Sequence, residues 1–253
     1  MVQSKTQFLQ LKKIAIAPIA VPNPLSIQAI LVPQGAEYRA ICRGLSRISS
    51  SKPVVVPLPV GTKAVTQYLQ SQHINLNQPQ PQVLVMGLCG SLNGRYKIGA
   101  TVLYQDCIYP VAGAEPRLQS CDRLFTKLLY SQLEAKVPVV KALTSDRLIY
   151  AANEKHYLAQ TYSTDVVDME GFAVLEILNQ SGVAVAMLRV VSDDCDRDIP
   201  NLTSALSPEG VLQPLPLAIA MIRQPIAAMR LIRGGLRGLK VLEKVTTALF
   251  SSN

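Results

Sequence analysis

The sequence has no tryptophan, only two histidines and no apolar run long enough to cross a membrane as a helix. His73 lies in a stretch rich in Gln, Asn and Pro, and His156 lies in a charged helical stretch, so we expect both at the surface. The sequence therefore offers few histidines for a Ser-His-Asp catalytic triad or for a histidine-rich metal site. The five cysteines are odd in number and lack CxxC spacing. This pattern favours reduced thiols in a cytoplasmic protein over a disulfide framework or a zinc site.

The length and hydrophobic content suit one folded domain. A chain of 253 residues, 49% of them hydrophobic, can bury a full core, and we expect a single domain over residues 1–253. Residues 1–26 are interpreted as an N-terminal extension. A targeting segment is the alternative, but Pro18 interrupts its short apolar stretch and no clear cleavage site follows.

Strand-like and helix-like segments alternate along the chain. Buried-strand patterns occupy residues 27–32, 53–58, 82–87, 100–109, 137–143, 165–169 and 183–192. Helical patterns occupy residues 36–49, 62–72, 118–133, 152–160, 169–181 and 225–249. Polar, proline-rich connectors are expected at 72–81 and 194–216. The alternation predicts an α/β fold of three layers, in which helices flank a twisted mixed central β-sheet.

Two short motifs flank one predicted helix–strand unit. Asp168-Met169-Glu170 precedes the helix, and Arg189-Val190-Val191-Ser192-Asp193 ends the strand. Ligands in open α/β sheets bind at the carboxyl ends of strands, so the acids can converge on one cleft. Two acids, an arginine and a methionine make no metal or phosphate motif. They suit chemistry that stabilises a sugar cation and protonates a leaving group.

With both motifs, the chain resembles the nucleoside phosphorylase and nucleosidase superfamily, whose adenosine-directed nucleosidases carry an acid-Met-Glu triplet and a downstream Arg-x-x-Ser-Asp. Residues 83–109 resemble its strand, glycine-rich turn and following strand. Residues 30–41 fit its first strand and helix-starting glutamate, and residues 143–150 fit its base-binding segment. The resemblance implies cleavage of the N-glycosidic bond of a purine nucleoside, without a metal or organic cofactor. It also implies a homodimer or higher homo-oligomer.

The resemblance assigns roles to the second motif and to the end of the first. Asp193 would protonate the purine base as it leaves, once burial raises its proton affinity, and Ser192 would orient it. From the residues alone, a loop cap is the favoured interpretation of Asp193, and only the register of the motif separates it from Asp194. Glu170 would bind the ribose hydroxyls and Met169 the sugar face.

Other candidate residues lie outside the two motifs or have strong structural alternatives. Arg189 would hold the sugar, with Glu170 or a substrate oxygen as its partner, or form a purely structural salt bridge. Glu37 matches the glutamate that positions the attacking water, but it also reads as an acid in the first turn of a helix. The family packs the base where Leu148 and Ile149 fall, and Asp146 is a weaker candidate there.

The glycine-rich turn both fits and departs from the family. Cys89 and Gly90 fall where the family approaches the ribose and, in phosphorylases, the phosphate. Leu88 stands where a serine is usual, and Met86 stands where hexameric phosphorylases carry a phosphate-binding arginine. Arg39, Arg43 and Lys63 are substitutes to consider. Water and inorganic phosphate therefore both remain open as the second substrate.

The C-terminal segment, residues 217–253, is expected to be basic, helical and amphipathic. Residues 221–253 hold six basic residues against one acid, within a net charge of +8. One broad apolar face is predicted for Ile226, Met229, Ile232, Leu236, Leu239, Leu242 and Leu249. Such a helix either lies on a membrane surface or packs on the domain body.

The tail resembles that of hopanoid-associated phosphorylases, which are thought to remove adenine from the membrane lipid adenosylhopane. That implies a lipid-linked nucleoside as the substrate and a peripheral membrane location, although the 5′ group itself is not encoded in any motif. No nucleic-acid partner is expected. The competing class is a non-catalytic relative, membrane-associated or nucleoside-sensing, for which the altered glycine turn is the argument.

Overall fold

The computed structural model describes residues 25–49, 51–71, 81–202, 205 and 213–251. Nearly all of the expected N-terminal extension and of the 72–81 connector lies outside these residues. Within the described part, eight strands form one mixed sheet. They are β1 (Ile27–Pro33), β2 (Val54–Leu58), β3 (Gln82–Ser91), β4 (Thr101–Tyr109), β5 (Arg117–Ser120), β6 (Val139–Thr144), β7 (Val166–Asp168) and β8 (Ala184–Asp193).

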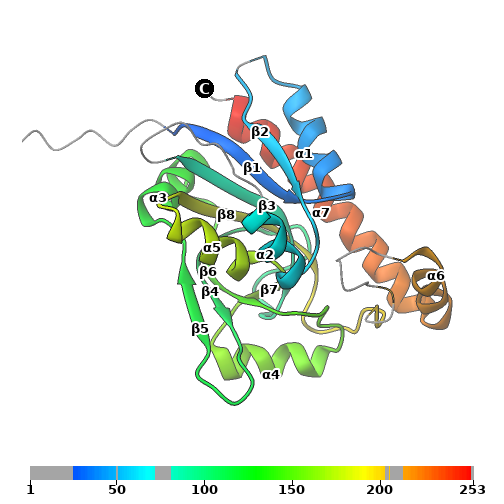
Figure 1. Cartoon of the computed structure of the whole chain (residues 1–253). Coiled ribbons are helices and arrows are strands. Elements are labelled where there is room, and N and C mark those ends of the chain that lie inside the picture. Colours follow the sequence, from blue (N-terminus) through cyan, green and yellow to red (C-terminus); the bar gives the residue numbers. More distant parts are fainter. Residues whose placement is uncertain (1–24, 50, 72–80, 203–204, 206–212, 252–253) are drawn as a thin grey trace, which may run out of the picture.

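The sheet has the order β2-β1-β3-β7-β6-β4-β5, and β8 pairs with both β3 and β4. The strands β3, β7, β6, β4 and β8 therefore form a closed ring, with β1, β2 and β5 attached outside it (Figure 1). The sheet contains parallel pairs, such as β3 with β8, and antiparallel pairs, such as β4 with β8. The expected twisted mixed sheet is confirmed, and the ring brings the ends of β3, β7 and β8 close together.

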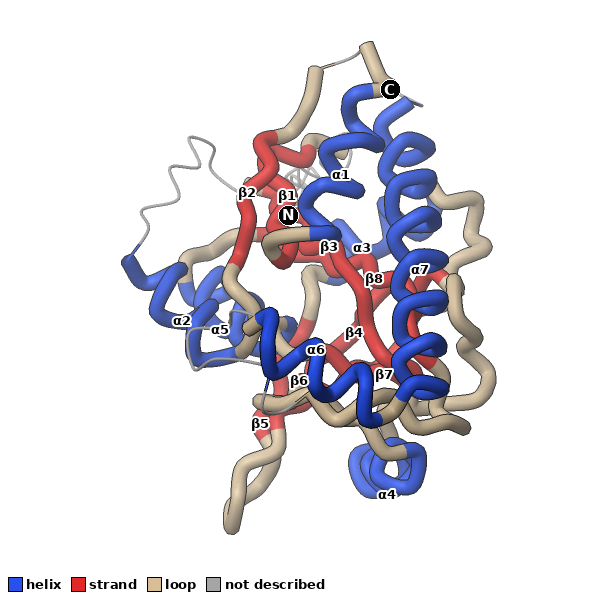
Figure 2. Tube along the Cα trace, turned by 90° about the vertical axis from the view of Figure 1, so that its right-hand side faces the viewer, coloured by secondary structure: helices blue, strands red, loops and turns tan. Residues whose placement is uncertain are grey.

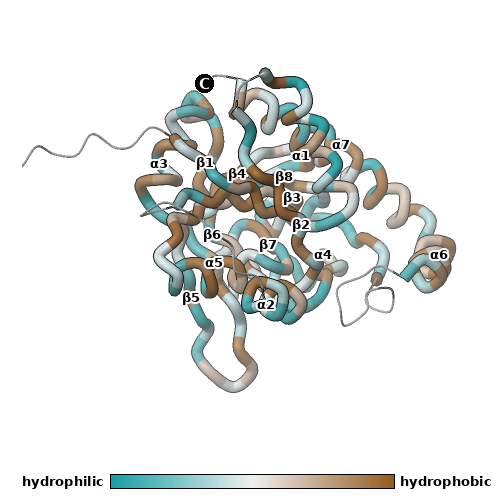
Figure 3. Tube along the Cα trace, turned by 45° about the horizontal axis from the view of Figure 1, so that its top comes forward, coloured by the Kyte–Doolittle hydropathy of each residue, from teal (hydrophilic) through white to brown (hydrophobic). Residues whose placement is uncertain are grey.

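Helices cover both faces of the sheet. They are α1 (Ala36–Ser46), α2 (Thr62–Ser71), α3 (Arg123–Gln132), α4 (Ala152–Tyr162), α5 (Gly171–Gln180), α6 (Pro214–Arg223) and α7 (Pro225–Ser251). One face buries apolar residues of α1, α3 and α7 with one set of strand side chains, and the other buries those of α2 and α5. Figures 1 and 2 show α1 and α7 side by side, away from α2 and α5. The apolar strands run through the centre of the molecule (Figure 3).

Two local predictions were wrong. The predicted helix over 118–133 is interrupted, because residues 117–120 pair with β4 as the strand β5 and the helix begins only after Asp122. The Asp122 carboxylate accepts a hydrogen bond from the Phe125 amide at 2.7 Å, an N-cap that fixes this start. The connector over 194–216 ends earlier than predicted, because α6 begins with a proline at Pro214, where the missing amide costs nothing.

The C-terminal helix divides into a packed half and an exposed half. Leu242 and Leu249 are buried and Leu239 is partly buried against the core, as in a helix packed on the domain. Ile226, Met229, Ile232 and Leu236 are instead between 51% and 68% exposed. Neither of the two alternatives, a helix on a membrane surface and a helix packed on the domain body, describes the whole of α7.

Among the described residues, no single helix is long and apolar enough to span a membrane. The pair α6 and α7, bent by 118°, meets the length and composition criteria only when taken together.

Glycines let α7 approach the end of β8. A Cβ atom at Gly234 would lie 2.0 Å from the Ser192 carbonyl oxygen, and one at Gly238 would lie 2.9 Å from a Leu88 methyl group. Real contacts are never this short, so any side chain at Gly234 must push the helix away from the strand end that carries Asp193. The two candidate features, the cleft and the basic helix, are thus directly adjacent.

Gly234→Ala should destabilise the protein, because the new methyl group meets a backbone atom that cannot move aside. Overpacking of this kind typically costs about 1–3 kcal/mol. The neighbouring Gly235 is the matched control, since nothing lies within 4 Å of a Cβ there. Gly235→Ala should be neutral or raise the stability by about 0.5–1 kcal/mol. Thermal unfolding of both variants checks this, and equal midpoints would contradict the close packing.

Candidate functional site

A cavity of about 190 Å³ lies where β3, β7 and β8 end. Nine of the ten residues predicted for the site line it: Glu37, Cys89, Gly90, Leu148, Ile149, Met169, Glu170, Ser192 and Asp193. The tenth, Arg189, is fully buried on β8, directly beside Gly87 of β3. A larger open hollow of about 620 Å³ lies over α3 and β5 and contains none of the ten.

Arg189 is held by Asp168. Its Nη2 donates to the Asp168 carboxylate at 3.1 Å, and both side chains are almost completely enclosed. The other Asp168 oxygen accepts from the Thr144 hydroxyl at 2.8 Å and the Gly171 amide at 3.1 Å. The sequence suggested Glu170 as the partner of the arginine, and it overlooked Asp168. The sequence did indicate this pair: Asp168 ends a buried strand, and a charge at such a position is tolerated only when it is paired.

The guanidinium of Arg189 is only partly satisfied. Its Nε and Nη1 atoms are buried and have no hydrogen-bond partner among the described residues. A Cβ atom at Gly87 would lie 2.3 Å from Nη1 and 2.8 Å from the Glu37 carboxylate, so glycine leaves room for both groups. Burial opposes the charge, but Asp168, Glu170 and Glu37 raise the pKa of Arg189, which keeps it cationic.

Glu37 and Glu170 face the cavity and do not cap their helices. Glu37 lies in the first turn of α1, yet its carboxylate accepts from the Leu88 amide of β3 at 2.6 Å. Glu170 immediately precedes α5, yet it makes no capping hydrogen bond and accepts from the Gly61 amide at 3.0 Å. The structural alternatives, helix-start acids, therefore do not account for where these carboxylates point.

Burial changes the protonation of both glutamates. It raises the pKa of Glu37 to about 7, although the Leu88 amide and Arg189 work against the rise. Burial also raises the pKa of Glu170 to about 7; Arg189 opposes this rise, while Asp168 and Glu37 add to it. A carboxyl group that is half ionised near neutral pH can exchange protons in either direction, as acid–base catalysis requires.

Asp193 is buried at the end of β8 in contact with two donors. The Ser192 hydroxyl lies 3.0 Å from one oxygen of its carboxylate, and the Lys155 ammonium donates to the other oxygen. Lys155 is itself completely buried and also donates to the Asp194 carbonyl at 2.8 Å. A Cβ atom at Gly90 would lie 3.0 Å from the Asp193 carboxylate, so the glycine turn leaves the space for it.

This geometry corrects the expected environment of the acid. The sequence predicted a carboxyl group protonated through burial alone, whereas a buried cation compensates its charge. The signal for Lys155 was its position: with Leu158, Ala159 and Tyr162 it occupies the inward stripe of α4, where an apolar residue is expected. The Asp194 carboxylate does not line the cavity and accepts from the Asp196 amide at 3.2 Å.

Of the three residues predicted to bind the base, two line the cavity and Asp146 does not. Ile149 is buried against Leu143 and Val167, and with Leu148 it forms an apolar wall of the cavity. Asp146 points elsewhere, since its carboxylate accepts from the Tyr109 hydroxyl at 2.7 Å.

The proposed substitutes for a phosphate-binding arginine do not line the cavity. Arg39 and Lys63 do not line the cavity, and Arg43 pairs with Glu243 at 2.9 Å. Met86 is fully buried in the core. Arg147 does line the cavity, although Glu154 pairs with it.

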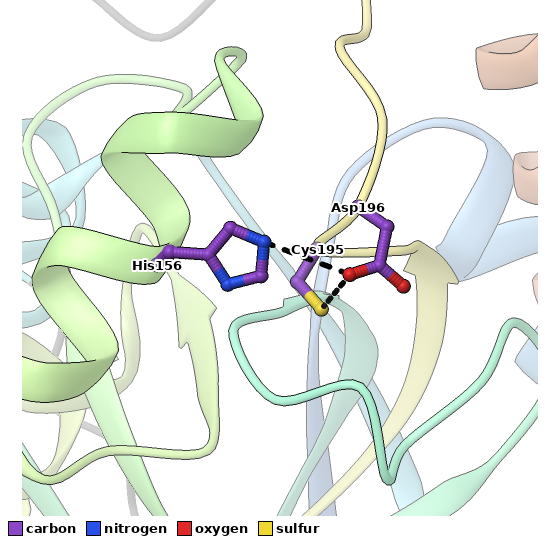
Figure 4. Close-up of side chains that lie close together, drawn as sticks. All are labelled: His156, Cys195 and Asp196. Carbon is purple, nitrogen blue, oxygen red and sulfur yellow. Dashed lines mark hydrogen bonds and ion pairs between the residues drawn. The ribbon is translucent and has the colours of Figure 1, made fainter.

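Outside the cavity, His156, Cys195 and Asp196 lie close together (Figure 4). Their donor atoms lie within 4.8 Å of one another and are of the types that bind zinc. However, burial and the Asp196 carboxylate raise the pKa of the Cys195 thiol, and Lys97 already lies 3.6 Å from Asp196. We therefore assign no ion to this group. His156 is about half exposed, which confirms its predicted surface position.

Solved structures share this fold. The 5'-methylthioadenosine/S-adenosylhomocysteine nucleosidase of Helicobacter pylori is 13% identical, with a TM-score of 0.65, over 91% of this chain and 100% of that one. Futalosine hydrolase of Helicobacter pylori is 13% identical, with a TM-score of 0.65, over 90% and 99%. The 5'-methylthioadenosine/S-adenosylhomocysteine nucleosidase of Neisseria meningitidis is 11% identical, with a TM-score of 0.62, over 89% and 98%. At such identities the likeness is one of fold.

No curated protein sequence matches the chain. A family model does, from residue 41 to residue 211, which is more than half of the sequence and includes the cavity residues of β3, β7 and β8. By its sequence and by its fold, this chain belongs to the phosphorylase superfamily.

Proposed function

We propose that the protein is an enzyme that cleaves the N-glycosidic bond between a purine, adenine, and ribose. The observation that carries this proposal is the meeting of Glu37, Glu170 and Asp193 around one cavity, with the Arg189 guanidinium behind it. A non-catalytic relative would have no need to keep two buried carboxylates and a partly buried one around one small space, because each costs stability unless it is paired. Water, or phosphate in the alternative reaction, is the one other reactant required.

Glu170 binds the ribose, and Arg189 supports the sugar end of the site from behind the cavity. Glu170 accepts hydrogen bonds from the ribose hydroxyls, and the buried guanidinium compensates the charge of the carboxylates that face the sugar. As the bond to the base lengthens, positive charge develops on the sugar. The carboxylates of Glu37 and Glu170 stabilise this oxocarbenium-like state more than the neutral ground state, which lowers the barrier. Met169 contributes an apolar contact to the sugar face.

Asp193 acts on the base. Leu148 and Ile149 hold the adenine ring, while Asp193 donates a proton to its N7 atom so that the base leaves as a neutral molecule. Ser192 orients the carboxyl group through its hydroxyl, 3.0 Å away. Positioned proton transfer of this kind contributes about 10²–10⁴ in rate.

Glu37 positions water, and we favour hydrolysis over phosphorolysis. With a pKa of about 7, Glu37 can accept the proton that water loses as it attacks the anomeric carbon. Leu88 and Met86 remove two phosphate contacts expected in phosphorylases, and Arg147 is the one cation that lines the cavity within the described chain. The similar solved structures named nucleosidase and hydrolase support the same preference.

An exposed apolar and basic surface next to the cavity points to a lipid-linked nucleoside as substrate. We define this surface, the α6–α7 face, by Leu215, Ile219, Ile222, Ile226, Met229, Ile232 and Leu236, all at least 42% exposed. Exposed arginines accompany it: Arg223, Arg230, Arg233 and Arg237. Apolar residues flanked by cations suit the headgroup layer of an anionic membrane. Because Gly234 packs on Ser192, the cavity lies beside this face.

We therefore propose that the protein binds the cytoplasmic membrane surface peripherally and removes adenine from an adenosine whose 5′ carbon carries a lipid. Adenosylhopane, implied by the tail's resemblance to hopanoid-associated phosphorylases, is the specific candidate. A homodimer or higher homo-oligomer remains part of this proposal.

Asp193→Asn should reduce the turnover of an adenine nucleoside by about 10² or more, because the amide cannot donate a carboxyl proton. Asp194→Asn is the matched control and should keep turnover within about threefold, since its side chain lies outside the cavity. Release of free adenine from adenosine or 5′-methylthioadenosine measures both. Asp193→Asn also leaves Lys155 without its counter-charge, so turnover is referred to the folded fraction. The reverse order of losses would show that the assigned acid is wrong.

The second product identifies the nucleophile. In phosphate buffer the wild-type protein should release the free sugar, not its 1-phosphate, at a rate that does not depend on phosphate concentration. Analysis of the sugar by mass spectrometry decides this. Formation of the 1-phosphate would show phosphorolysis and would direct attention to Arg147 as the phosphate contact.

Membrane binding is tested on the exposed half of the tail, because truncation would also remove packed residues. The protein should bind vesicles containing phosphatidylglycerol, and binding should weaken with salt. Arg223→Gln with Arg233→Gln should weaken it about 30-fold, at about 1 kcal/mol for each cation. The control is substitution by Gln of two exposed leucines on other elements, Leu118 of β5 and Leu124 of α3. Unchanged binding by the arginine variant would remove the lipid argument, whereas cleavage of soluble adenosine should survive in all variants.

A further inference from the structure

Lys155 is the one buried residue of α4, a helix that the structure describes completely. Its ammonium group has no exposed surface and contacts two acceptors, the Asp193 carboxylate and the Asp194 carbonyl. The other inward residues of α4 pack only partly on the small cluster around Ile149. A lysine at this position costs stability compared with a methionine of similar size, since burial of an ion pair is rarely a net gain. This cost in stability favours a functional role for Lys155 in the site.

We propose that Lys155 and Asp193 act together as the acid that protonates the leaving base, and that Lys155 is the store of the proton. This inference rests on the proposed function, because it concerns the same cavity and the same leaving group. In the resting protein the Lys155 ammonium donates its hydrogen bond to the Asp193 carboxylate. The ammonium therefore holds a proton that can be transferred within the pair.

The step balances as follows. A nucleoside in the cavity excludes water, which disfavours two separate charges and favours transfer of a proton from Lys155 Nζ to the Asp193 carboxylate. The neutral carboxyl group then gives its proton to N7 as the C1′–N9 bond breaks and its electron pair stays on the purine. Water adds its oxygen to C1′ and loses a proton to Glu37. After the products leave, Lys155 regains a proton from solvent, and Glu37 releases one.

The loop after β8 is fastened to α4 so that this contact is maintained. The Asp198 carboxylate accepts from the Ala152 amide at 2.8 Å and caps the start of α4, which has no cap of its own. The Ile199 amide donates to the Tyr150 carbonyl at 3.0 Å. These two hydrogen bonds join the segment that carries Lys155 to the loop that follows Asp193, and they hold the ammonium group near the aspartate.

Other titratable groups face this pair from every side. Cys89 of β3 lies near Asp193, and burial keeps its thiol protonated by raising its pKa. From the loop after β8, the Asp194 and Asp196 carboxylates lie outside the cavity, and Lys97 and His156 pair with Asp196. On α4, Glu154 pairs with Arg147. The Asp194 carboxylate accepts from the Asp196 amide, and Asp196 and Glu154 have cationic partners. Lys155 is the cation in contact with Asp193.

The pH dependence of kcat separates a proton store from a charge partner. For Lys155→Met, shared storage predicts that kcat at pH 7.5 falls by about 10² or more and that the pH optimum moves to lower pH, with full recovery prevented because Glu37, with a pKa of about 7, is protonated there. The isolated aspartate then takes its proton directly from solvent. If Lys155 only balances charge, its removal makes the carboxylate easier to protonate, and activity extends to higher pH. The two predictions differ in sign.

Two further variants complete the experiment. Lys155→Arg keeps the charge, but a guanidinium does not release its proton, so kcat referred to the folded fraction should fall about 10². Lys97→Met, in the neighbouring exposed pair, is the control and should keep the wild-type profile. If Lys155→Met does not fold, Lys155→Arg decides the question alone.

The outcomes are distinct. A wild-type protein that releases no base from any purine nucleoside contradicts the proposed function itself. An active wild type with a Lys155→Arg variant of normal kcat, or a Lys155→Met variant active at higher pH than the wild type, contradicts only the shared acid. Loss of kcat in both, with little change in KM and a pH optimum of the Met variant below that of the wild type, supports it.

Discussion

The buried guanidinium of Arg189 is the interaction on which the site depends. It lies on a central strand, completely enclosed, with Asp168 as its direct partner and Glu37 and Glu170 close enough to change its electrostatics. A buried cation needs this compensation, and the carboxylates around it in turn need the cation. The ring of strands makes the arrangement possible, because it brings β3, β7 and β8 together at the ends that carry these residues.

Two buried cations divide the acids of the cavity into two functions. Arg189 organises the carboxylates at the sugar end, where charge develops on ribose, and leaves Glu37 and Glu170 with pKa values of about 7. Lys155 organises Asp193 at the base end, where a proton is needed. The sugar end and the base end of the cavity thus give different environments to side chains that are all carboxylic acids. Such separation is how a single site can run acid and base steps at one pH.

The sequence predicted the strands well, because buried strands are short apolar runs and their ends carry the motifs. It also predicted the residues around the cavity, but through family resemblance, since Glu170 alone reads as a helix-start acid. It missed the Asp168–Arg189 and Lys155–Asp193 pairs, 21 and 38 residues apart in the chain. Such pairs depend on how strands and helices meet, which local patterns do not encode. The strand β5 was missed for the same reason, because its pairing with β4 overrides a helical pattern.

The most direct test of this account is the affinity for a charged mimic of the sugar cation. An adenine nucleoside analogue with a protonated pyrrolidine in place of ribose should bind at least about 10²-fold more tightly than its uncharged carbocyclic counterpart, because the carboxylates around Arg189 favour the cation. Isothermal titration calorimetry of both compounds at neutral pH gives the ratio. Equal affinities would contradict the claim that this cavity is built to stabilise a positively charged ribose.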